Sequence, residues 1–203
     1  MSIEKQKSHW DLKYEQGLPS LIEPDPFFVF ACEHFVGPLF PNGGDALDLA
    51  CGLGRHALWL AARDWRVCGV DLSEVAIRKL NHAALELNVS LDLFVGDASE
   101  YKVGSAQFDL IVMFYHADRN LFPKLVSALK PGGLMICKLS VRWDTDATST
   151  SANTDPVNRN ELPSLVPDLQ VLCHEERQVR DRGVVEFAGW KAIPENLKIQ
   201  RCS

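Results

Sequence analysis

The chain has 203 residues, of which 46% are hydrophobic and 24% are charged, a composition typical of one globular domain with a sizeable core. Lysine and arginine total 21 against 27 acidic residues, so the net charge is −6; with no basic block, a long nucleic-acid partner is not expected. The polar start "MSIEKQKSHW" and the short apolar runs exclude a secretory signal and a membrane span, which favours a cytoplasmic protein.

Helices and strands are expected to alternate along most of the chain. The N-terminal helices are placed at 8–16 and 26–36, the second because Asp25 followed by Pro26 is a typical helix start. Ser73 is expected to cap a later helix, and Asp64 to end one in a left-handed conformation. The further helices are expected at 55–64, 74–87, 120–130 and 158–165, and the strands at 45–50, 65–71, 90–97, 107–114, 134–140, 169–180 and 183–193.

This alternation predicts an α/β fold with a parallel sheet and helices on both of its faces. The last two strands meet at Asp181-Arg182-Gly183 and are expected to form an antiparallel hairpin. The tract 142–158 is rich in Ser, Thr, Asp and Asn, so it is expected to be a surface loop.

A glycine turn is expected where the strand at 45–50 meets the following helix, in "ALDLACGLGRHAL". Gly52 and Gly54 lie in this turn, and Asp71 follows Gly52 by nineteen positions, which approaches the dinucleotide fingerprint. Asp48, however, lies inside the strand, where its carboxylate would repel a pyrophosphate. A ligand with positive charge, such as an α-amino group or a sulfonium, suits this position better.

Four segments in this order, "DLACGLGRHAL", "VCGVDLS", "VGDASEY" and "FDLIVMFYHADRNLFPKLVSALKPGGLMI", resemble the successive motifs of class I S-adenosylmethionine-dependent methyltransferases. The resemblance covers about Trp10 to Ala192. More narrowly, "HWDLKYEQG", "PDPF" and "RNELPSLVPDLQVLCHEE" are similar to the small tellurite-resistance and thiopurine methyltransferase branch.

This resemblance implies a three-layer, Rossmann-like sheet of seven strands in the order 3-2-1-4-5-7-6, with strand 7 antiparallel. A single domain over 1–203 would comprise an N-terminal helical cap (1–40), cofactor-binding βα units (45–139), a polar loop (140–158), and a helix with the C-terminal hairpin (159–192). The implied function is methyl transfer to a small-molecule acceptor, with S-adenosylhomocysteine as the second product.

The resemblance also implies where S-adenosylmethionine would bind. The turn from Ala50 through Cys51 and Gly52 to Gly54 would wrap its methionine portion, and Asp71 would accept hydrogen bonds from both ribose hydroxyls. The remaining expected contacts are Leu72 on the adenine face, Asp97 and Ala98 at the adenine amino edge, Arg55 at the carboxylate end, Trp10 and Tyr14 closing over the cofactor, and Asp48 and Met113. Structural roles remain open beside these: a helix-capping Asp71, a turn Asp97, an exposed Arg55, and a core pair Trp10–Tyr14.

The methyl acceptor is expected above the ends of the fourth and fifth strands, where open α/β sheets bind ligands. His116 is the candidate base there because its imidazole titrates near neutral pH, although a purely structural histidine is an open alternative. A thiolate or selenide acceptor would need no base, whereas an oxygen or amine would. The candidate acceptor-binding residues are Tyr115, Arg119, Arg142 and Trp143.

No metal is expected. The six cysteines (Cys32, Cys51, Cys68, Cys137, Cys173 and Cys202) form no C-x-x-C pair and are read as reduced thiols. Asp118-x-Asn120 is read as a helix cap. Two other functions remain open, a protein or RNA methyltransferase and a cofactor-binding protein without turnover, and the sequence does not specify an oligomeric state.

Overall fold

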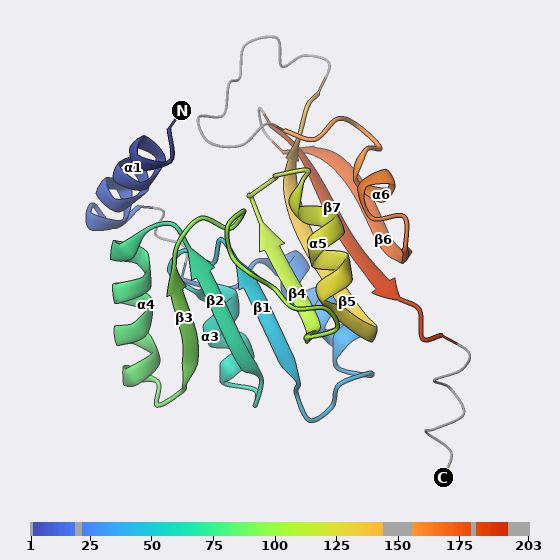
Figure 1. Cartoon of the computed structure of the whole chain (residues 1–203), viewed down its shortest axis with the longest axis horizontal. Helices are drawn as coiled ribbons and strands as arrows, with labels where there is room; N and C mark the ends of the chain where they lie inside the picture. The colour runs from blue at the N-terminus through green and yellow to red at the C-terminus, as the bar shows by residue number, and fades with distance from the viewer. Residues whose placement is uncertain (1, 19–21, 144–155, 180–181, 195–203) are drawn as a thin grey trace.

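The computed structural model describes residues 2–18, 22–143, 156–179 and 182–194, and a single seven-stranded sheet runs through it (Figure 1). The strands are β1 (Asp45–Leu49), β2 (Arg66–Asp71), β3 (Leu91–Val95), β4 (Phe108–Phe114), β5 (Leu129–Val141), β6 (Leu169–Val179) and β7 (Arg182–Lys191). Their order is β3-β2-β1-β4-β5-β7-β6. β7 is antiparallel to both of its neighbours, whereas the pairs among β1 to β5 are parallel. The expected order and the antiparallel seventh strand are therefore confirmed.

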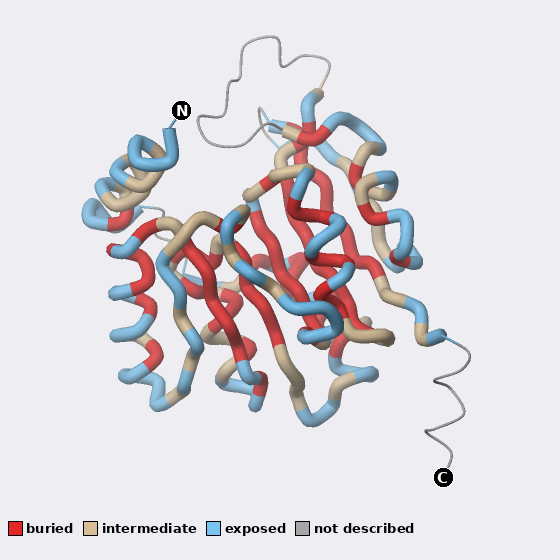
Figure 2. Tube along the Cα trace, viewed as in Figure 1, coloured by how far each residue is buried: buried red, intermediate tan, exposed pale blue. Residues whose placement is uncertain are grey.

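Helices cover both faces of this sheet. They are α1 (Ile3–Glu15), α2 (Pro26–Ala31), the π-helical η1 (Cys32–Val36), α3 (Arg55–Ala61), α4 (Glu74–Glu86), α5 (Leu121–Ala128) and α6 (Leu162–Leu165). Side chains of α2, η1 and α3 form one core cluster against the sheet, and those of α5 and α6 form a second. α4 contributes to two smaller clusters. Successive strand residues point to opposite faces, so the central strands are apolar on both sides and almost entirely buried (Figure 2).

Local sequence signals determine several element ends as expected. Asp25 accepts a hydrogen bond from the Phe27 N–H over 3.0 Å and caps α2. Ser73 does the same for α4, where its Oγ accepts from the Ala76 N–H at 3.1 Å. Asp64 follows α3 with a φ of 63°, the left-handed conformation expected for it.

Other boundaries differ from expectation. α1 begins at Ile3 rather than at residue 8, and the helix that begins at Pro26 ends in the π-helical turn η1. α5 ends at Ala128, and β5 begins at Leu129 instead of after Pro131-Gly132-Gly133. Leu129 is fully buried and pairs with β4 through a register shift, so burial of this side chain outweighs the glycine-proline signal. In the polar tract, residues 144–155 lie outside the described residues.

The carboxyl ends of the parallel strands β1 to β5 lie along one edge of the sheet. The turns after β1, β2 and β3, which carry most of the predicted cofactor-binding residues, lie at this edge. α1 lies beyond this edge and packs against α4 (Figure 1). In the described parts of the chain, no helix is long and apolar enough to cross a membrane.

Candidate functional site

The turn after β1 contains three residues with positive φ angles, a backbone conformation that residues other than glycine rarely adopt. Gly52 and Gly54 have φ angles of 56° and 76°, and Ala50 has a φ of 57°. A Cβ on Gly52 would lie 2.7 Å from the Tyr14 hydroxyl, and one on Gly54 would overlap the Leu80 side chain. Both glycines are therefore required by conformation and by close approach.

Asp71, the last residue of β2, joins this turn to the start of α4. Its Oδ2 accepts from the Gly52 N–H at 2.7 Å and its Oδ1 from the Ser73 N–H at 2.8 Å. The carboxylate is 8% exposed, and burial raises its pKa. A carboxylate offers about four lone-pair positions, and the described backbone fills two of them. The expected ribose role and the capping role are thus compatible.

Asp48 lies beneath the same turn and is 2% exposed. Its Oδ2 accepts from the Ala57 N–H at 3.1 Å, but burial dominates and raises its pKa to about 7. Asp71 nearby raises this pKa further, and Arg55 lowers it. A ligand that brings positive charge to this place would stabilise the ionised form of Asp48.

The N-terminal helix α1 is held over this region by Asp11, a residue that the sequence did not single out. Asp11 Oδ1 accepts from the Ser73 Oγ at 2.5 Å and from the Val75 N–H at 3.3 Å, so α1 contributes a cap to α4. Trp10 and Tyr14 stack with ring centroids 5.6 Å apart, and Tyr14 is buried. A lone aspartate in a helix carries no sequence signal for a partner 62 positions away.

On the expected adenine side, Asp97 forms a turn. Its Oδ1 accepts from the Ser99 N–H at 2.8 Å, while Ala98 is buried and Leu72 is half-buried. Met113 has no exposed surface and packs within the core cluster on the α5 face, so its side chain offers no free surface to a ligand in this conformation.

The end of β4 carries the candidate acceptor residues. Tyr115 has a φ of 57°, donates its N–H to the Lys138 carbonyl at 2.7 Å, and is 47% exposed. The Nε2 of His116 is buried and has no hydrogen-bond partner among the described residues. Burial lowers the pKa of His116, so the imidazole is neutral at pH 7 and has a lone pair for a proton.

The other three candidate acceptor residues contact the segments around the polar tract. Arg119 forms a two-point ion pair with Glu161, at 2.6 and 2.8 Å. Arg142 is exposed, and Trp143 packs on the core with the Arg159 guanidinium 4.6 Å from its ring centroid. In this conformation Arg119 positions the segment before α6.

A cluster of charged side chains that sequence reasoning also missed lies at the carboxyl edge, between the sheet and α2; we call it the edge ion cluster. The Lys138 Nζ of β5 is 3.0 Å from both Asp25 oxygens and 2.9 Å from the Glu186 Oε1 of β7. Arg177 of β6 contacts the same Glu186 oxygen at 2.6 Å, and Arg55 lies 3.7 Å from the Asp25 Oδ2. Apart from Arg177, these side chains are largely buried.

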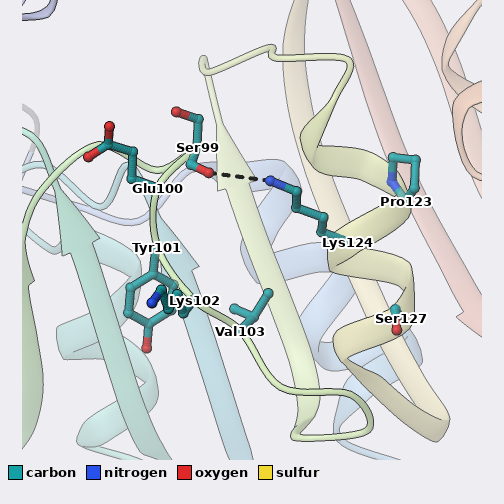
Figure 3. A pocket seen from close by; sticks show the side chains of 8 residues that line it. All are labelled: Ser99, Glu100, Tyr101, Lys102, Val103, Pro123, Lys124 and Ser127. Carbon is teal, nitrogen blue, oxygen red and sulfur yellow. Dashed lines mark hydrogen bonds between the residues drawn. The ribbon is translucent and has the colours of Figure 1, made fainter.

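A separate groove of about 520 Å³ lies between α5 and the loop after β3 (Figure 3). Lys124 reaches across it toward the Ser99 carbonyl, 3.4 Å away. None of the expected cofactor or acceptor residues lines this groove, so we do not assign the site to it. No group of three or more His, Cys, Asp or Glu side chains in the described ranges is arranged to hold a metal ion.

Known proteins resemble this chain in sequence and in fold. Residues 46–133 match the family model described as a methyltransferase domain. Methyltransferase GfsG of Streptomyces halstedii is 33% identical over 149 residues, which cover 66% of this chain and 52% of the relative. A tRNA (uracil(54)-C(5))-methyltransferase of Pyrococcus furiosus is 30% identical over 122 residues, 58% of this chain and 29% of that protein. The chain thus spans about half the length of the first of these relatives, and less of the second.

Solved structures share the fold at low sequence identity. The [4+2]-cyclase SpnF superposes with a TM-score of 0.79 at 15% identity, covering 95% of this chain and 97% of that one. TehB from Haemophilus influenzae gives a TM-score of 0.71 at 18% identity, covering 88% of this chain and 66% of that one. Motif order, sheet topology and the domain matched over residues 46–133 together support a class I S-adenosylmethionine-dependent methyltransferase domain in this chain.

Proposed function

We propose that the protein transfers the methyl group of S-adenosylmethionine to a small-molecule acceptor and releases S-adenosylhomocysteine. The observation that carries the proposal is the pair of buried carboxylates, Asp48 and Asp71, on either side of the glycine turn. One suits the cationic end of the cofactor and the other its ribose hydroxyls. A pyrophosphate in this turn would be repelled by Asp48 whenever that carboxyl is ionised.

The bound cofactor would supply a methyl group on a sulfonium, which an acceptor atom attacks in line. The described residues contribute positioning and exclusion of water. Tyr14 packs on Gly52, and Asp11 holds α1 against α4. Holding two reactants in line contributes about 7–11 kcal/mol toward the barrier. A cationic sulfonium or amino group close to Asp48 would favour the ionised form of this carboxyl, which burial disfavours.

The acceptor class that we favour is a thiol or a chalcogen compound. His116 is neutral and has an unpartnered, buried Nε2 beside the end of β4, so it would take the proton of an acceptor that is not already ionised. The structural similarity to TehB supports the fold of this branch, and the acceptor itself is our proposal.

A second candidate is methylation of RNA, which the Pyrococcus furiosus relative favours. The net charge of −6 argues against it, because RNA binding depends on neutralised phosphates. A third candidate is a role without methyl transfer, since the solved neighbour SpnF is described as a cyclase. Both candidates predict cofactor binding; the second differs from our proposal in its methyl acceptor, and the third in the absence of methyl transfer.

The first test is calorimetric titration of S-adenosylhomocysteine, with NAD as the parallel ligand. Saturable binding of S-adenosylhomocysteine alone is expected, and Asp71→Ala should weaken it at least about tenfold because two charge-assisted hydrogen bonds are lost. Asp92→Ala is the matched control, since Asp92 is an exposed aspartate on neighbouring β3. Preference for NAD, or equal affinity of wild type and Asp71→Ala, would refute the assignment.

A further inference from the structure

Arg55 differs from the other charged side chains of the edge ion cluster in how little it contacts. It is the first residue of α3, directly after Gly54, and its side chain is 15% exposed. Its guanidinium lies 3.7 Å from the Asp25 Oδ2 and 6.0 Å from the centroid of the Phe114 ring. Both partners place it beside the end of β4.

The guanidinium donors are not satisfied by the described protein. A guanidinium has five N–H donors, and within the described residues the Arg55 side chain makes no hydrogen bond, only the long ion pair and the ring contact. Asp25 gives it little, because Lys138 and the Phe27 N–H already contact its oxygens at 3.0 Å. No Arg55 nitrogen is among the buried side-chain atoms without a partner, so its unbonded donors face solvent, where a ligand that supplies oxygen acceptors can reach them.

The charges of the edge ion cluster lead to the same conclusion. Lys138 and Arg177 are paired closely with Asp25 and Glu186, two cations with two carboxylates. Arg55 is the third cation and has no carboxylate of its own in the cluster. Asp48, the other acid near it, is held by burial in a form that ionises only near pH 7. The net positive charge at the cluster therefore resides on Arg55.

The Arg55 guanidinium also lies toward the acceptor side. The positive charges of Lys138 and Arg55 lower the pKa of the Tyr115 hydroxyl, although burial raises it overall. The Arg55 charge also lowers the pKa of Asp48 in β1. Its contacts, however, are with Asp25 and with the ring of Phe114, the last residue of β4.

We propose that Arg55 binds an anionic oxygen group, a carboxylate or oxyanion, on the methyl acceptor and makes the protein selective for acidic acceptors. This inference rests on the proposed methyl-transfer function and specifies its substrate class. The cofactor also carries a carboxylate that a guanidinium can bind. The experiment must therefore distinguish binding of an anionic acceptor from binding of the cofactor carboxylate.

The test uses protein saturated with S-adenosylhomocysteine and labelled with [15N]arginine, with the Nε–Hε signal of Arg55 identified by its absence in Arg55→Lys. Acetate and selenite are the anionic probes, and acetamide is the neutral one. A saturable shift of the Arg55 signal is expected with an anionic probe and none with acetamide. The exposed Arg63 near the end of α3, which contacts the Trp59 ring, should not shift and serves as the internal control.

A second arm measures S-adenosylhomocysteine and 5′-methylthioadenosine, which lacks the amino-acid group, against Arg55→Gln and the matched control Arg63→Gln. Both affinities are expected to change less than about twofold in Arg55→Gln. Loss of S-adenosylhomocysteine affinity alone, by about tenfold or more, would assign Arg55 to the cofactor carboxylate and overturn the proposal. Absence of any anion-induced shift would overturn it too. Failure of wild type to bind S-adenosylhomocysteine would instead refute the proposed function.

Discussion

Replacing Asp48 by asparagine should make the cofactor-free protein more stable at neutral and higher pH. Burial raises the pKa of Asp48 from 3.8 to about 7. Between these values the unfolded chain has released the proton and the folded protein retains it, so the unfolded state binds fewer protons and stability falls as pH rises. About three pH units at 1.36 kcal/mol each correspond to a loss on the order of 4 kcal/mol. Asparagine has the same shape, keeps an oxygen for the Ala57 N–H and does not titrate.

Urea denaturation of wild type and Asp48→Asn at pH values from about 4 to about 8 measures this difference. The two proteins should have similar stability near the acidic end, and the variant should become the more stable one as the pH approaches about 7, with no further divergence above it. Asp92→Asn, the same substitution at an exposed position on β3, is the control. A difference between wild type and Asp48→Asn that stays constant with pH would refute the assignment of a buried, proton-retaining carboxyl.

Three further substitutions test the glycine turn and the helix above it. Gly54→Ala should lower the free energy of unfolding by about 2 kcal/mol or more, measured by urea denaturation, because its Cβ overlaps Leu80 and its φ is left-handed; an unchanged midpoint would contradict this. Ala50→Gly should raise stability by roughly 1 kcal/mol in the same assay, since glycine adopts its φ of 57° without strain, and a loss of stability would show that the Ala50 methyl group packs favourably. Asp11→Ala should remove the contact to Ser73, so backbone amides of α1 should exchange hydrogen about tenfold faster; unchanged exchange would mean that the contact does not hold the helix.

Features that depend on neighbouring residues could be predicted from the sequence. Asp25 before Pro26, Ser73 before α4 and Asp64 after α3 each act on their own backbone, so their residue types are sufficient signals. The apolar run of β4 likewise requires burial on both faces wherever it lies. The sheet order followed from the family resemblance, not from these local patterns.

The features that were missed join residues distant in sequence. Asp11 reaches α4 across 62 positions, and Lys138 meets Asp25 across 113. A lysine inside an apolar strand indicates a buried partner, but Asp25 and Glu186 are two of many carboxylates that the chain offers. Arg119 shows the reverse: its position suggested a ligand contact, and the structure supplies a protein partner in Glu161.

The insertion of β7 between β5 and β6 has a consequence for synthesis of the chain. β5 pairs with β7 over Leu134 to Val141, yet β7 is the last of the described strands to leave the ribosome. Until it emerges, the nascent sheet ends in an apolar strand with unpaired N–H and C=O groups, a template for pairing between chains. A chain truncated before β7 would retain the whole glycine turn and still be prone to aggregate. The glycine turn and the strand that covers the edge of β5 thus lie more than 120 residues apart in the sequence.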